Sequence, residues 1–229
     1  MQSRLADPKG GGYFLAEADP NSPMARPRDT ADGALPSANG VAVQVLAALA
    51  RRSGEMRFEE RAEAQLSALS GTIQRDPASH ATLLVAMQRL RTGETGSLQY
   101  AARGAVRVSA RAVAQGANGA RVELTLSIKP GWHINARQPL QDDLVPTTLK
   151  PATADWRVVR IDYPQAEVVK LGFQKQALAL YQGDATVRAE LQRKAATTDD
   201  VVPLELRLQS CSDRVCLPPE TLRLEVRSR

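Results

Sequence analysis

The two cysteines of the chain lie in one stretch, Gln209-Ser-Cys-Ser-Asp-Arg-Val-Cys-Leu-Pro-Pro-Glu220, with four residues between them. Apolar and polar residues alternate before it, over residues 202–209, and after it, over residues 221–226. This period of two is typical of half-buried strands. We therefore expect Cys211 and Cys216 to lie at a strand-turn-strand corner, where a turn can bring their Cα atoms within disulfide range.

Three kinds of site fit this cysteine pair. A zinc site needs two more ligands, and the only histidines, His80 and His133, are far apart in the sequence. A structural disulfide would stabilise the fold only weakly, because closing so short a loop raises the free energy of the unfolded chain by roughly 2 kcal/mol. A redox-active pair needs an accessible sulfur and a second sulfur nearby, which this spacing supplies. Asp213 and Arg214 act on a thiolate with opposite charges, so the spacing alone leaves the structural and redox interpretations open.

Composition restricts the class of protein. Of the 229 residues 43% are hydrophobic and only 4% aromatic, so a core must be built mainly from aliphatic side chains. The net charge of +5 arises from interspersed acidic and basic residues, which argues against nucleic-acid binding. No apolar run is long enough to span a membrane, and residues 1–10 lack the apolar segment of a secretory signal. We expect no cofactor and no metal.

The first part of the chain has the period of amphipathic helices. Apolar residues at helical spacing predict helices over residues 41–52, 57–75 and 78–91. Ser37 is expected to cap the first of them, and Gly54 to end it. We assign residues 1–92 to a helical domain and residues 93–104, which include Gly and Thr, to a linker.

From residue 105 the period of the pattern changes from 3.6 to 2. Alternation and turn residues predict about eight strands, at residues 106–113, 120–128, 146–150, 156–163, 176–181, 185–191, 202–209 and 221–226. Short strands at such spacing, with no helical pattern between them, are typical of an immunoglobulin-like β-sandwich. The predicted fold is a short helical segment followed by such a sandwich over residues 105–229.

Trp132 and His133 follow the second predicted strand and are candidates for the site. Core packing is the commonest role of a tryptophan. A general-base role for His133 requires Cys216 within hydrogen-bond reach of its ring.

The cysteine stretch resembles the motif of a known family. Cys-Ser-Asp-Arg-Val-Cys-Leu-Pro-Pro-Glu is similar to the cysteine motif of the N-terminal periplasmic domain of the thiol:disulfide interchange protein DsbD, and closer still to that of the related disulfide bond corrector domains. The resemblance covers about residues 106–226. Three more stretches occur in the family's order, namely Leu124-Thr-Leu-Ser-Ile-Lys-Pro-Gly-Trp-His-Ile-Asn135, Asp162-Tyr-Pro-Gln165 and Leu180-Tyr-Gln-Gly183.

This resemblance implies a function for the cysteine pair. Cys211 and Cys216 are expected to exchange disulfides with a thioredoxin-like protein or domain, in the periplasm if the chain is part of a longer exported protein. The second cysteine, here Cys216, is expected to form the mixed disulfide. Phe173 resembles the aromatic residue that caps the pair, with Trp132 and His133 as neighbours. The alternative is a binding or scaffold module that is stapled by a structural disulfide.

A second resemblance covers about residues 1–90. Gly11-Gly-Tyr-Phe14, Arg26-Pro-Arg-Asp29 and Asp32-Gly-Ala-Leu-Pro-Ser-Ala-Asn-Gly40 are similar to the closing part of the YyaL family, although Ala38 stands where that family has glycine. Members join a thioredoxin-like domain to an α/α toroid, so the resemblance implies that Met1 is an internal methionine of a longer protein. Glycoside hydrolysis uses paired carboxylates such as Asp29 and Asp32, but turn formation is the commoner role of such aspartates.

Overall fold

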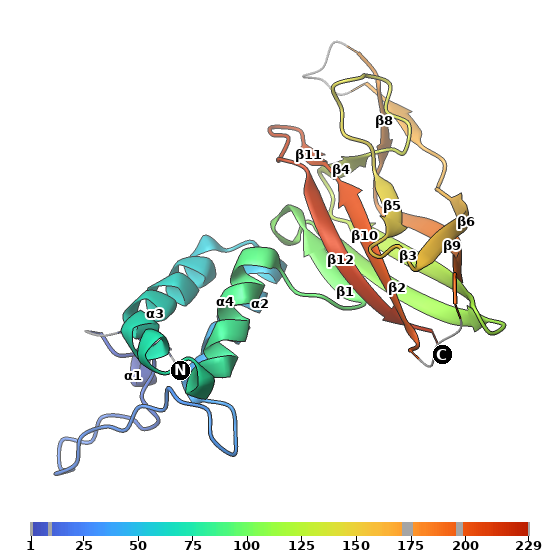
Figure 1. The fold of residues 1–229 in the computed structure, drawn as a ribbon. Helices are drawn as coiled ribbons and strands as arrows, with labels where there is room; N and C mark the ends of the chain where they lie inside the picture. Colours follow the sequence, from blue (N-terminus) through green and yellow to red (C-terminus); the bar gives the residue numbers. More distant parts are fainter. Residues whose placement is uncertain (1, 9–10, 171–175, 196–198, 229) are drawn as a thin grey trace. The chain divides into compact units, whose positions relative to one another are not determined.

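The chain forms two compact units, Met1–Gly93 and Glu94–Arg229, each with its own hydrophobic core (Figure 1). They are seen in a computed structural model that describes residues 2–8, 11–170, 176–195 and 199–228. Among these residues, no helix combines the length and the apolar character that crossing a bilayer requires.

The first unit is helical. Its elements are α1 (Gln2–Leu5), α2 (Ala38–Ser53), α3 (Met56–Arg75), the 3-10 helix η1 (Ala78–His80) and α4 (Ala81–Thr92). The predicted helices are confirmed, except that the first turn of the third one is the separate helix η1. Their apolar faces meet in a small core of Val43, Leu46, Ala62, Leu69, Leu83 and Ala86.

Local chemistry sets the ends of α2 as the sequence predicts. The Ser37 hydroxyl accepts a hydrogen bond from the Gly40 N–H at 3.0 Å, and Gly54 ends the helix in the left-handed conformation, with φ 74°. Gly40 also allows α2 to approach α4, because a Cβ atom there would lie 2.7 Å from the Thr82 methyl carbon. These residues therefore fix where the helix begins, where it ends and how closely it packs.

The loop that contains Asp29 and Asp32 holds helix ends together. The Asp32 carboxylate accepts hydrogen bonds from the N–H groups of Ser37 at 2.9 Å and Thr82 at 2.7 Å, at the starts of α2 and α4. Asp29 accepts one from the Ala38 N–H at 3.3 Å. Both carboxylates thus bond to backbone donors at helix N-termini, which is the turn-forming and capping role rather than a catalytic pairing.

The second unit consists of antiparallel β-strands in three sheets (Figure 1). The five-stranded sheet has the order β1 (Leu98–Ala101), β2 (Val106–Gln115), β3 (Gly119–Ile128), β9 (Asp184–Arg193) and β6 (Trp156–Asp162). The three-stranded sheet has the order β12 (Glu220–Arg227), β10 (Val201–Leu208) and β5 (Thr148–Pro151). The four-stranded sheet has the order β11 (Ser210–Ser212), β4 (Trp132–Asn135), β8 (Leu178–Tyr181) and β7 (Glu167–Val169).

The alternating residues of the long strands build the core of this unit. One face of β2, β3 and β9 and one face of β10 and β12 are buried, whereas the residues between them are half-buried or exposed. The core is mainly aliphatic, as the low aromatic content predicts, and includes Val106, Val108, Leu124, Leu126, Val187, Leu204, Leu206 and Leu224. The sandwich-like arrangement and all eight predicted strands are present, with ends that differ by a few residues.

The strands that the sequence did not predict are all short, with three or four residues each. β4, β7 and β11 have three or four residues each, too few for a period of two to be recognised. β1 lies in the stretch expected to be a linker, where Leu98–Ala101 pairs antiparallel with β2. It is followed by the short 3-10 helix η2 (Ala102–Gly104).

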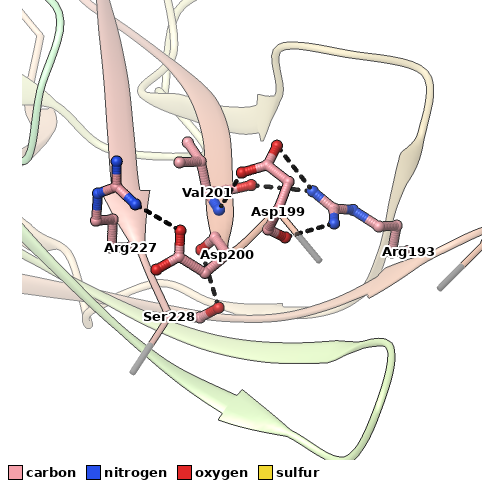
Figure 2. Close-up of polar contacts among 6 residues, drawn as sticks. All are labelled: Arg193, Asp199, Asp200, Val201, Arg227 and Ser228. Carbon is pink, nitrogen blue, oxygen red and sulfur yellow. Dashed lines mark hydrogen bonds and ion pairs between the residues drawn. The ribbon is translucent and has the colours of Figure 1, made fainter. Parts of the chain in front are cut away.

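A cluster of polar residues joins the ends of β9, β10 and β12 (Figure 2). The Arg193 guanidinium donates to the carbonyl oxygens of Asp199 at 2.7 Å and Val201 at 3.2 Å. Asp200 accepts a bond from Arg227 at 2.7 Å, and its carbonyl accepts two from Ser228. The cluster fixes the start of β10, the strand that leads to the cysteines.

Candidate functional site

The cysteines lie in a small hairpin where the chain changes sheet. β10 ends at Leu208 in the three-stranded sheet, and β11 begins at Ser210 in the four-stranded sheet. Cys211 and Cys216 form a disulfide with an S–S distance of 2.08 Å and a Cα–Cα distance of 4.0 Å. The predicted strand-turn-strand corner is therefore present. The sequence did not predict that the chain also passes from one sheet to another there.

Backbone hydrogen bonds on both sides of the pair hold the hairpin. The Ser212 N–H donates to the Val215 carbonyl at 2.8 Å, and the Leu217 N–H donates to the Ser210 carbonyl at 2.9 Å. Cys211 and Cys216 are thus a pair without hydrogen bonds to each other, the type in which antiparallel residues approach most closely. Backbone pairing thus places the two cysteines directly opposite each other.

Side chains of two residues reinforce this hairpin. The Ser212 hydroxyl accepts hydrogen bonds from the N–H groups of Arg214 and Val215, each at 3.2 Å. The Gln209 amide donates to the Leu217 carbonyl at 3.2 Å, and its oxygen accepts from Asn135 at 3.2 Å and from the Val145 N–H at 3.3 Å. Sequence reasoning missed Gln209 and Ser212. Ser212 could have been found, because a serine beside a turn often bonds to the turn backbone. No local signal marks Gln209.

The two sulfurs differ in exposure. Cys211 is buried, with 2% of its surface exposed, whereas Cys216 belongs to the exposed residues. Because Val215 and Leu217 bond toward β11, the N–H and C=O of Cys216 point the other way. Neither group has a hydrogen-bond partner within the described part of the chain. Cys216 is therefore an exposed residue, and the strand edge at this position is unpaired within the described part of the chain.

The structure brings His133 next to Cys211 and places Trp132 elsewhere. In the pairing of β4 with β11, His133 lies opposite Cys211 and Trp132 lies opposite Ser212. Side chains of directly opposite residues share a face, so His133, Cys211 and Cys216 form a row on one face of the sheet. Trp132 is half-buried and packs against the sandwich core. The residue opposite His133 is thus Cys211, whereas a general-base role would require Cys216 within hydrogen-bond reach.

The His133 ring is in a low-dielectric environment. Only 4% of the residue is exposed, and its Nε2 atom is buried without a hydrogen-bond partner among the described residues. Burial lowers the pKa of His133 below its ordinary value, because desolvation penalises the charged ring. At neutral pH the ring is therefore neutral, with one N–H donor and one acceptor nitrogen.

Two further expectations concern the surroundings of the pair. Phe173, expected to cap the sulfurs, lies outside the described residues. The described parts of the chain contain no group of three His, Cys, Asp or Glu side chains that could hold a metal ion.

Comparison with known proteins assigns the second unit to a family. The sequence profile of the family described as "Thiol:disulfide interchange protein DsbD, N-terminal" matches residues 102–228, and no curated protein matches the chain. The N-terminal periplasmic domain of ScsB from Proteus mirabilis aligns at 20% identity and a TM-score of 0.39, over 52% of this chain and 45% of that chain. This chain thus spans less than half of the ScsB chain.

The N-terminal domain of DsbD from Neisseria meningitidis, in its reduced form, aligns at 21% identity and a TM-score of 0.39, over 55% of this chain and 86% of that chain. The profile match spans more than half of the sequence and includes both cysteines and the Gly-Trp-His-Ile-Asn stretch. The chain therefore belongs to the family of the N-terminal domain of the thiol:disulfide interchange protein DsbD.

Proposed function

We propose that the chain is a thiol:disulfide exchange module, which passes electrons between Cys211–Cys216 and a thioredoxin-like protein or domain. The observation that carries the proposal is the asymmetry of the pair, an exposed Cys216 joined to a buried Cys211. Exchange requires one sulfur that a partner can reach and a second sulfur that leaves or resolves. Membership of the DsbD N-terminal family supports the same chemistry.

Cys216 is the sulfur that meets the partner, and Cys211 is the resolving one. A partner thiolate attacks the Cys216 sulfur, the Cys211–Cys216 bond breaks, and its electron pair moves to the Cys211 sulfur. The second thiol of the partner then attacks the mixed disulfide, so the partner becomes oxidised and this pair reduced. The reverse sequence of steps oxidises the pair. Burial of Cys211 supports these roles, because an incoming thiolate cannot reach a covered sulfur.

The unpaired edge of Cys216 gives the partner a place to dock. Its N–H and C=O groups can pair with an extended segment of the partner, as in strand addition to a sheet edge. Such pairing would hold the partner's thiolate beside the exposed sulfur. Phe173 is proposed from the resemblance as the cap that must move aside first.

The alternative, a structural staple, receives less support from the geometry. The hairpin is already closed by backbone bonds and by Ser212 and Gln209, and a disulfide across so short a loop constrains the unfolded chain weakly. The reduction potential separates the two functions. A value close to those of thioredoxin-like proteins supports exchange, and one below about −300 mV supports the staple.

Trapping of a mixed disulfide tests the roles directly. Cys211→Ser leaves the reactive sulfur without its resolving partner and should accumulate a mixed disulfide with a thioredoxin-like protein. Cys216→Ser leaves only the buried sulfur and should accumulate none. Equal trapping by both variants contradicts the assignment of roles, and trapping by neither, with a pair that glutathione cannot reduce, favours the staple.

We also propose a domain organisation, which rests on the two sequence resemblances. Residues 1–92 are the end of an α/α toroid of the YyaL type, 93–104 a linker and 105–229 the redox module, in a longer exported protein that works in the periplasm. The loop of Asp29 and Asp32, which ties helix ends together, supports the helical part. Reading the gene upstream of Met1 tests it, since a thioredoxin-like domain and the rest of a toroid should be encoded there.

A further inference from the structure

His133 occupies a position in the site that the exchange reaction, as described above, leaves without a task. It is the first member of the row His133, Cys211 and Cys216, with Cys211 between the ring and the exposed sulfur. Its Nε2 atom is a buried polar atom without a partner among the described residues. Leaving a buried polar atom unsatisfied destabilises a fold, so a histidine with such an atom opposite a reacting cysteine calls for a reason.

The elements paired with β4 offer few other groups to this ring. On β11 the titratable side chain is Cys211 itself, and Asp213 and Arg214 follow in the exposed turn. On β8 it is Tyr181, which lies opposite Ile134 and therefore on the core face, where its hydroxyl accepts a bond from the Arg137 N–H at 3.0 Å. Among the groups in these pairings, only the Cys211 sulfur is both on the face of His133 and able to change charge.

We propose that His133 donates a hydrogen bond from Nε2–H to the Cys211 sulfur when that sulfur leaves as a thiolate. The inference rests on the proposed exchange function and adds to it a residue that touches a reacting atom. In the disulfide form the Cys211 sulfur is bonded to Cys216, and Nε2 of His133 has no hydrogen-bond partner among the described residues. Once the bond breaks, rotation about the Cα–Cβ bond of Cys211 is free to turn the sulfur toward the ring.

The chemical step balances with a dithiol of the thioredoxin class as reductant. The partner thiolate forms a bond to the Cys216 sulfur, and the electron pair of the broken S–S bond becomes the negative charge of Cys211. That charge forms on a residue of which only 2% is exposed, so water solvates it poorly. A neutral imidazole supplies the missing donor without adding a charge of its own, and a hydrogen bond to a charged group is among the stronger ones in proteins.

Thiol titration in the full chain tests the proposal. Cys216→Ser isolates the Cys211 thiol, and the pH dependence of its alkylation is compared with that of the double variant Cys216→Ser/His133→Phe. Loss of a donor to the thiolate should shift the midpoint upward by about one pH unit. His133→Gln keeps an N–H donor in place of the ring and should recover part of the shift.

His80 provides a matched control. It is the other histidine of the chain, is 3% exposed, has a buried Nε2 without a partner among the described residues, and lies in the helical unit. His80→Phe makes the same chemical change away from the sulfurs and should leave the midpoint where it is. An unchanged midpoint in His133→Phe, or an equal shift in His80→Phe, overturns the proposal.

A measurement without substitution at His133 keeps the test decisive if His133→Phe does not fold. The nitrogen chemical shifts of the wild-type ring, compared between the oxidised and reduced protein, should change most at Nε2. Identical Nε2 shifts in the two states overturn the proposal. A wild-type protein that no thioredoxin-class dithiol reduces refutes the exchange function instead, while the alkylation midpoints still report on His133.

Discussion

At the residue scale, Ser212 connects the buried sulfur to the turn that returns the chain to the exposed one. Its hydroxyl accepts two backbone hydrogen bonds inside the hairpin, from Arg214 and Val215. These bonds involve no sulfur atom, so we expect them to keep Cys211 and Cys216 close after reduction. We therefore expect Ser212 to favour re-formation of the Cys211–Cys216 disulfide.

Ser212→Ala should make the reduced pair harder to oxidise. The two hydrogen bonds to the hydroxyl are worth about 0.5–1.5 kcal/mol each, and losing about 1 kcal/mol of their support for the closed pair should lower the equilibrium constant for disulfide formation against glutathione about fivefold. Ser212→Thr retains the hydroxyl and serves as the control. Equal constants for the alanine variant and the wild type would show that the backbone alone positions the sulfurs.

Asp32 should make the helical unit sensitive to acid. Hydrogen bonds from backbone N–H groups, mainly that of Thr82 and then that of Ser37, hold the pKa of this carboxyl below its ordinary value of 3.8. Because the folded-state pKa is the lower one, the stabilisation is fully present above about pH 4 and is lost as pH falls through the folded pKa.

Asp32→Ala removes this capping interaction and should destabilise the helical unit by about 1 kcal/mol at neutral pH. Thermal unfolding followed by circular dichroism at 222 nm measures the change, and the difference from wild type should shrink in acid. Asp143→Ala, at an exposed position of the other unit, is the control. A difference that is independent of pH would show that the charge of Asp32 does not matter.

At the element scale, the polar cluster around Arg193 holds the start of β10, the strand that precedes the cysteines (Figure 2). Its guanidinium bonds two carbonyls at the start of β10 and lies 4.7 Å from the centre of the Trp156 ring. Only 11% of the Arg193 side chain is exposed, so these contacts are little screened by water. The planar fork of an arginine suits this double contact, which a lysine cannot reproduce.

Arg193→Ala should therefore lower the free energy of unfolding of the β unit by about 1–3 kcal/mol. Arg188, on the same strand, provides a control, because its ion pair with Glu123 has both side chains largely exposed. Arg188→Ala should change stability by less than about 1 kcal/mol. Urea unfolding of both variants measures the difference, and equal effects would show that the cluster is no stronger than a surface ion pair.

Elements also show how far the sequence could predict the site. Long strands were predictable, because eight to ten residues of alternation reveal which face is buried. β4 and β11 were not, because they have only four and three residues, too few to show an alternation. The neighbourhood of Cys211 and Cys216 follows from their spacing, whereas that of His133 and Cys211 depends on a register between segments far apart in the chain.

At the scale of the whole molecule, the boundary between the two units lies earlier than the expected linker suggests. Gly96 and Ser97 already accept backbone hydrogen bonds from Glu225 and Ala110 of the β unit, and β1 follows at Leu98. The segment that can be cut without disturbing either core is thus confined to the residues just after Gly93. A protease specific for glutamate has one target there, Glu94.

The expected product is a folded β unit that retains the redox site. Cleavage after Glu94 should leave the β strands and both cysteines on one fragment, with its own cooperative unfolding transition and unchanged thiol reactivity. The helical fragment should behave differently, because α2 exposes Val41, Val45 and Leu49 at a spacing of four residues, along one side. Size-exclusion chromatography and circular dichroism of the separated fragments measure this. A helical fragment that stays monomeric and well folded contradicts the toroid assignment, and a β fragment that loses its structure contradicts the boundary.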